Sequence, residues 1–240
     1  MSTQVWAHRG ASGYAPENTL PAFALAAEQG ADGIELDVQL TKDKEVVVIH
    51  DEKIDRVCAE KGFVKDYTLQ ELKKLSFHNH IPEYRGVQIP TLREVYELVA
   101  PTGMCVNVEL KTGIFFYEGL EEKVLEIAKE YDMEDRVWYS SFNHETLVKL
   151  KQLDSSVRTG MLYADGIVNA LEYAKTVGVD AMHPALYNLQ YKGFLENCKK
   201  ENIPIHVWTV NEEEDMENLV KQNIAAIITN YPDKACAVRK

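Results

Sequence analysis

The chain has 240 residues, of which 45% are hydrophobic and 27% charged, and its formal net charge at pH 7 is −12. This composition is typical of a globular protein with a full core, and the length suits one large α/β domain or two small ones. The acidic balance argues against a broad nucleic-acid-binding surface, which usually needs a basic patch. The sequence contains neither a run of about 20 apolar residues that predicts a membrane span nor the pattern of a secretion signal. We therefore expect a cytoplasmic protein.

Short apolar runs alternate with amphipathic segments along most of the chain. The apolar runs predict strands at residues 4–8, 33–40, 45–50, 104–110, 136–141, 158–162, 179–182, 205–210 and 225–229. The amphipathic segments predict helices at residues 20–29, 117–131, 144–153, 167–177, 191–201 and 212–222. Strands and helices that alternate at this spacing indicate parallel strands joined by right-handed crossovers.

Two architectures fit this alternation, an eight-stranded β/α barrel and a doubly wound open sheet. The strand count favours the barrel, although nine predicted strands are one too many. The string LTKDKE at residues 40–45 is typical of a hairpin turn, so the next strand could run antiparallel, and its direction stays open. We predict a single TIM (β/α)8-type barrel domain over residues 1–240. Its small inserted subdomain, at about residues 51–103, follows the strand that ends at His50.

Ionisable side chains stand at the ends of four predicted strands. In IELDV, Glu35 and Asp37 share one face of a strand because side chains alternate, and Glu109 is placed in the same way in VNVEL. His8 and His50 end two further strands. Because the carboxyl ends of the strands line the active site of a β/α barrel, we expect these five side chains to gather in one pocket.

The chemistry of these groups predicts a metal-dependent reaction on an anionic substrate. Three carboxylates in one pocket repel each other unless a cation is present. An all-oxygen ligand set favours Mg²⁺ or Ca²⁺ over zinc. One such ion, with Arg9 and Lys111, reverses the local charge and lets the pocket attract a phosphodiester. His8 and His50 are candidates for the general acid and base, since this cleavage needs one proton removed and another delivered.

Several strings of this sequence resemble the glycerophosphodiester phosphodiesterase family. They are HRG and PENT, then ELDV, VVIHD, NVELK, WTVN and TNYPD, in order between Val5 and Asp233. The resemblance implies a TIM barrel with a small insertion after the strand carrying His50. It also implies hydrolysis of small-molecule glycerophosphodiesters, such as glycerophosphocholine, to an alcohol and glycerol 3-phosphate.

The resemblance extends to individual residues. It implies that His8 and His50 form the acid–base pair, and that Glu35, Asp37 and Glu109 hold one divalent ion, Mg²⁺ or Ca²⁺.

The remaining matched residues lie around this centre. The resemblance implies that Arg9 and Lys111 bind the substrate phosphate, that Glu17 supports the metal or the opening loop, and that Asn18 anchors that loop. Trp208 matches a late tryptophan of the family and is expected to pack against the glycerol or choline end of the substrate.

One position departs from the family pattern. Its last motif is usually T-D-x-P-D, and Asn230 stands in place of the first aspartate, so the usual charge is missing there. The sequence also leaves the attacking group open. A glycerol 2-hydroxyl could form a cyclic phosphate that water then opens, or water activated at the cation could attack directly.

Two other functions are compatible with the same residues. One is a phospholipase C-like or lysophospholipase D-type phosphodiesterase, and the other is a non-catalytic barrel that binds phosphodiesters. Apart from IFFY at residues 114–117, we find no apolar rim loop or basic amphipathic helix, and we expect no stable membrane association. An exposed IFFY segment could instead form a homodimer contact.

Overall fold

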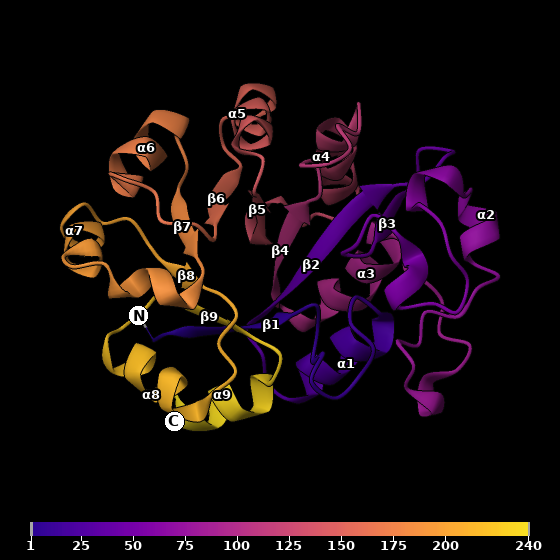
Figure 1. Cartoon of the computed structure of the whole chain (residues 1–240), viewed down its shortest axis with the longest axis horizontal. Coiled ribbons are helices and arrows are strands. Elements are labelled where there is room, and N and C mark those ends of the chain that lie inside the picture. Colours follow the sequence, from indigo (N-terminus) through magenta and orange to yellow (C-terminus); the bar gives the residue numbers. More distant parts are fainter. Residues whose placement is uncertain (1, 240) are drawn as a thin grey trace.

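A closed barrel of parallel strands forms the centre of the protein. The structure is a computed structural model that describes residues 2–239, and eight parallel strands surround the barrel axis in this range (Figure 1). These strands are β1 (Gln4–His8), β2 (Gly33–Leu40), β4 (Cys105–Leu110), β5 (Val137–Ser141), β6 (Arg158–Tyr163), β7 (Ala181–Pro184), β8 (His206–Val207) and β9 (Ala226–Thr229). Their order is β7-β6-β5-β4-β2-β1-β9-β8. Parallel bridges from Met182 to Ile205 and from Ala185 to Trp208 join β7 to β8 and close the barrel.

The predicted barrel is thus confirmed, and the open doubly wound sheet is excluded. The extra strand is β3 (Val46–Val48), which pairs with β2 in the antiparallel direction, with Leu40 opposite Val46. The hairpin turn predicted before it is therefore present, and it settles the direction that the sequence left open. Because β3 is shorter than predicted, His50 lies two residues beyond its end.

Helices surround the strands on the outside of the barrel (Figure 1). They are α1 (Leu20–Glu28), α3 (Leu92–Val99), α4 (Leu120–Glu130), α5 (His144–Leu153), α6 (Ala170–Val177), α7 (Phe194–Lys200), α8 (Glu213–Lys221) and α9 (Pro232–Val238). The sequence patterns did not predict α3 or α9. Helices α4, α6 and α7 begin later than predicted because Gly119, Asn169 and Gly193 precede them with positive φ, a conformation that an α-helix cannot contain.

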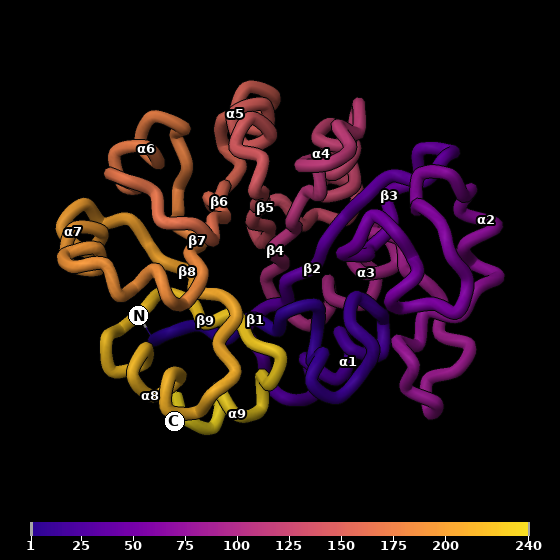
Figure 2. Tube along the Cα trace, viewed as in Figure 1, coloured from indigo at the N-terminus to yellow at the C-terminus, as the bar shows by residue number. Residues whose placement is uncertain are grey.

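The segment between β3 and α3 packs around a hydrophobic core of its own. This core consists of Val47, Ile49, Ile54, Val57, Cys58, Val64, Leu72, Phe77 and Ile89. The segment contains α2 (Leu69–Leu72) and the 3-10 turns η1 (Ile54–Arg56), η2 (Val64–Asp66) and η3 (Pro82–Tyr84). Figure 2 shows it outside the ring, beside α1 and α3. Helix α3 instead contributes its buried face to the main core, so the segment between β3 and α3 that packs separately, residues 49–89, is here called the insertion.

Aromatic and imidazole rings fill the barrel below the carboxyl ends of its strands. The ring centroid of His206 lies 4.4 Å from that of Trp6 and 4.8 Å from that of Trp138. His206 Nδ1 also lies 2.8 Å from His183 Nε2, and all four side chains point into the barrel. Trp6 precedes His8 by two residues on the same strand face, so this layer forms the floor beneath His8.

Among residues 2–239, no helix combines the length and the apolar character that crossing a membrane requires.

Three further 3-10 turns connect elements of the barrel. They are η4 (Ala100–Thr102), η5 (Glu134–Arg136) and η6 (Leu186–Gln190).

Candidate active site

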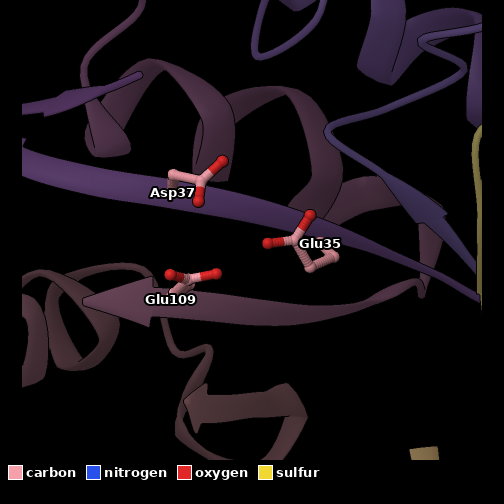
Figure 3. Close-up of side chains that lie close together, drawn as sticks. All are labelled: Glu35, Asp37 and Glu109. Carbon is pink, nitrogen blue, oxygen red and sulfur yellow. The ribbon is translucent and has the colours of Figure 1, made fainter. Parts of the chain in front are cut away.

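Three carboxylates meet inside the barrel on neighbouring strands. Register places Asp37 of β2 opposite Glu109 of β4, and Glu35 lies two residues earlier on the same face of β2. One carboxylate oxygen from each residue lies within 4.8 Å of the other two. Figure 3 shows the three groups pointing toward one another from the two strands, and all three are buried.

The opening loop after β1 supports this arrangement from one side. Gly10 has a φ of +83°, and a Cβ there would lie 2.7 Å from the backbone of Ala22, so only glycine lets the loop pack this closely on α1. The loop brings the Arg9 backbone N–H to Glu35 Oε2 at 3.0 Å. It also lets Asn18 Nδ2 donate to Asp37 Oδ2 at 2.8 Å.

Basic groups keep one of the three carboxylates ionised. Burial alone would raise the pKa of Asp37, but Arg9, His50 and Lys111, with the hydrogen bond from Asn18, hold that pKa well below its usual range. Arg9 Nε lies 3.4 Å from Asp37 Oδ2, and Lys111 Nζ lies 3.9 Å from Asp37 Oδ1.

The other two carboxylates lack enough positive charge around them. Burial and repulsion from its two acidic neighbours raise the pKa of Glu35 well above the ordinary value. Burial also raises the pKa of Glu109, although Lys111 Nζ donates to Glu109 Oε1 at 2.8 Å. Asp37 Oδ1 is buried and accepts no hydrogen bond from any of residues 2–239. A cation would supply the missing charge and a partner for this oxygen, so the triad could hold a metal ion.

His8 faces the triad with a single nitrogen. Its Nδ1 donates to Asn230 Oδ1 at 2.7 Å, because an amide oxygen only accepts, and its Nε2 lies 4.0 Å from Glu35 Oε2. Burial and the neighbouring Arg9 guanidinium lower the pKa of His8 to about 4. The ring is therefore neutral at pH 7, with an unprotonated Nε2 directed toward the carboxylates.

His50 has a carboxylate partner instead. Its Nδ1 lies 2.6 Å from Asp51 Oδ1. Although burial opposes ionisation, hydrogen bonds from Arg56 and His50 hold the pKa of Asp51 at about 2. The two candidate histidines thus differ in the group that contacts Nδ1. This group is a neutral amide for His8 and a charged carboxylate for His50.

A buried glutamine fixes the backbone that carries His50. Gln39 Nε2 lies 3.2, 2.9 and 2.8 Å from the carbonyl oxygens of Ile49, His50 and Asp51. Its Oε1 accepts a 2.9 Å hydrogen bond from the Tyr117 hydroxyl. Gln39 is fully buried on β2, and it continues the strand face of the two acidic residues before it. Gln39 was not among the residues predicted from the sequence, although the same alternation places it on this face.

Six of the ten predicted site residues, His8, Arg9, Glu35, His50, Glu109 and Trp208, line one small cavity. This cavity of about 50 Å³ is lined by His8, Arg9, Glu35, His50, Asn107, Glu109, Phe142, Leu162, Trp208 and Ile228. Trp208 donates from Nε1 to the His183 carbonyl and packs edge-on against Phe142. Glu17 bonds to Arg9 rather than to the acidic triad. Asp51, Arg56 and Phe142 were not among the residues predicted from the sequence.

Comparison with known proteins agrees with the resemblance of the sequence strings. The model of the glycerophosphoryl diester phosphodiesterase family matches residues 8–234. A glycerophosphodiester phosphodiesterase of Caldanaerobacter subterraneus subsp. tengcongensis is 46% identical over 234 residues, which cover 97% of this chain and 96% of that protein. One from Bacillus altitudinis is 41% identical and covers 99% and 98%. An Oleispira antarctica phosphodiesterase, solved in complex with the product sn-glycerol-3-phosphate, has a TM-score of 0.89 at 31% identity, covering 99% and 96%. The chain belongs to the glycerophosphoryl diester phosphodiesterase family.

Proposed function

We propose that this protein hydrolyses glycerophosphodiesters to an alcohol and glycerol 3-phosphate. The observation that carries the proposal is the buried acidic triad, together with two histidines that line the same cavity as Glu35 and Glu109. Family membership supports it, as do the 46% identical relative that is named for this activity and the Oleispira structure with its product.

A divalent cation completes the proposed site. Glu35, Asp37 and Glu109 would hold it. The buried Asp37 Oδ1, which has no hydrogen-bond partner in the described part of the chain, fits such a role. The all-oxygen donor set favours Mg²⁺ or Ca²⁺. When bound, the cation would act as a Lewis acid and stabilise the negative charge that develops on the phosphate oxygens.

The two basic side chains at the triad would bind the phosphate group. Arg9 and Lys111 already pair with carboxylates, so both are held in place before substrate arrives. Arg9 is oriented further by Glu17, whose Oε1 accepts from its guanidinium at 2.9 Å. Because the positively charged side chains of Arg9 and Lys111 are already fixed, they would position an anionic phosphodiester with little loss of entropy during the reaction.

The different partners of the two histidines suggest different tasks. His8 presents a neutral Nε2 toward the triad and would accept the proton of the attacking hydroxyl. His50 would deliver a proton to the leaving alkoxide, since Asp51 can share the positive charge of a protonated ring.

Two attacking groups remain compatible with this assignment. His8 could deprotonate the glycerol 2-hydroxyl, which would give a cyclic phosphate that water opens in a second step. It could equally deprotonate a water molecule that attacks phosphorus directly. Turnover of a substrate without the 2-hydroxyl separates these routes, because normal turnover would exclude the cyclic phosphate.

The proposed activity is tested with glycerophospho-choline, -ethanolamine, -inositol and -glycerol, each with Mg²⁺ or Ca²⁺. We expect release of glycerol 3-phosphate from at least one substrate, and its suppression by EDTA. His8→Ala and His50→Ala should each lose about 100-fold or more in kcat, as expected for a general acid or base. His80→Ala, at an exposed histidine of the insertion, is the matched control and should stay near the wild-type rate. No release under any condition would refute the proposed function.

A further inference from the structure

Arg56 connects the insertion to the barrel through two carboxylates. It lies at the end of η1, and its guanidinium donates to both oxygens of Glu17, at 2.6 and 2.8 Å. It also donates to both oxygens of Asp51, at 2.7 and 3.1 Å. Glu17 in turn accepts from Arg9, and Asp51 accepts from His50. One guanidinium thus completes a chain of alternating charges that runs from Arg9 to His50.

We propose that Arg56 is a positioning residue that fixes the His50 ring for proton transfer by holding the Asp51 carboxylate. This inference rests on the proposed function, in which His50 serves the leaving group. Arg56 itself lines neither the cavity nor the acidic triad. It would therefore act through Asp51 rather than on the substrate.

The exposure of these groups explains why His50 needs such support. The side chain of His50 is 31% exposed and that of Asp51 is 32% exposed, so packing alone leaves both with room to rotate. A planar guanidinium that contacts both carboxylate oxygens restricts rotation of the Asp51 side chain. Asp51 Oδ1 then stays in line with His50 Nδ1, which fixes both the ring orientation and the nitrogen that carries the proton.

The second carboxylate supplies the rigid end of this chain. The side chain of Glu17 is only 13% exposed, and it is tied to Arg9 in the opening loop. Asp51 and Arg56 both belong to the insertion, whereas Glu17 belongs to the opening loop of the barrel. By contacting both carboxylates, Arg56 therefore anchors Asp51 to the barrel. A merely structural role, in which Arg56 only attaches the insertion, would affect all substrates equally.

The kinetic test compares Arg56→Gln and Arg56→Lys with wild type on two substrates. Glycerophosphocholine has an alkoxide leaving group that needs a proton, whereas the 4-nitrophenyl diester of glycerol phosphate releases a weakly basic phenolate. We expect Arg56→Gln to lower kcat about 10- to 100-fold on the first substrate, with KM changed less than about threefold. On the nitrophenyl ester the loss should stay below about threefold. Arg56→Lys should lie between, because lysine keeps the charge without the planar fork.

Arg93→Gln is the matched control, since it removes an arginine that pairs with Glu130 on the outer helices. It should leave both rates unchanged. Asp51→Asn provides a further check. If Arg56 acts through Asp51, Arg56→Gln should add little to the loss already caused by Asp51→Asn, and full additivity would contradict the proposal. Equal losses on both substrates, or no loss on either, would overturn it.

Nitrogen NMR of the His50 ring tests the proposal without any turnover. At a pH where the ring is neutral, wild type should carry its proton on Nδ1, bonded to Asp51. Arg56→Gln should populate both tautomers, while Arg93→Gln should match wild type. An unchanged His50 spectrum in Arg56→Gln would refute the positioning role. Inactivity of wild type on every diester would instead refute the proposed function, and the spectrum would still decide the role of Arg56.

Discussion

Replacing Glu35 with glutamine should stabilise the protein when no metal is bound. Carboxylate oxygens of Glu35, Asp37 and Glu109 lie within 4.8 Å of one another. Two unit charges at that separation repel by about 3 kcal/mol at an effective dielectric constant of about 20. The Arg9 backbone N–H offsets part of this repulsion at Glu35. We therefore expect Glu35→Gln to raise the free energy of unfolding by about 1–3 kcal/mol at pH 7.

The pH dependence of this effect has a defined sign. The pKa of Glu35 in the folded protein is raised above its ordinary value of 4.5. As pH rises, the unfolded chain therefore releases this proton first, and the folded state loses stability through the window between the two pKa values. Glu35→Gln should remove that loss, so its advantage over wild type should shrink toward pH 4.

The assay is equilibrium urea unfolding of both proteins in EDTA and in excess Mg²⁺ or Ca²⁺. In EDTA, Glu35→Gln should be the more stable protein. At a metal concentration of about 100 times Kd, wild type should gain about 2.7 kcal/mol, and the variant should gain much less. Glu126→Gln, at an exposed glutamate of α4, is the control and should change neither value. Lower stability of Glu35→Gln in EDTA would refute the argument that these carboxylates repel each other.

Two further substitutions test the supports of the histidines. Asn230→Asp should raise the pKa of His8 from about 4, because a carboxylate next to Nδ1 favours the charged ring. The acid limb of the pH profile of kcat/KM should therefore move to higher pH. An acid limb that does not move would contradict the assignment of His8 as the base. Gln39→Leu should cost about 2–3 kcal/mol in unfolding free energy, since it leaves buried carbonyl oxygens and the Tyr117 hydroxyl without a partner. The same variant should lower kcat by loosening the backbone of His50, and wild-type stability together with wild-type kcat would contradict this role.

The acidic triad could be predicted because it depends on the most regular feature of the chain. Alternation along β2 and β4 decides which face each side chain occupies. Glu35, Asp37 and Glu109 are therefore all on the face opposite the apolar side chains of their strands. Parallel pairing of β2 with β4 then places the three carboxylates next to one another. The two histidines followed from their places at or beyond strand ends.

The supports of the histidines could not be predicted in the same way. Arg56 lies in a 3-10 turn without a periodic pattern and reaches Glu17 from 39 positions away in the chain. Asn230 meets His8 across 222 positions. Such contacts form where loops that follow different strands meet at the same end of the barrel. A local sequence pattern does not encode which loop residues meet there. Helix starts were misplaced for a local reason, because a residue with positive φ, such as Gly193, delays the first turn.

If the acidic triad binds a cation as proposed, the pairing of Asp37 with Glu109 across β2 and β4 would also link that binding to correct assembly of the sheet. A slip of one residue in either strand would turn its acidic side chains outward, toward the helices, and leave the pocket without a complete ligand set. Only the correctly registered barrel could then bind the cation tightly. A divalent ion present during refolding would therefore select this register by mass action, so that the proposed ion would also act as a check on the fold.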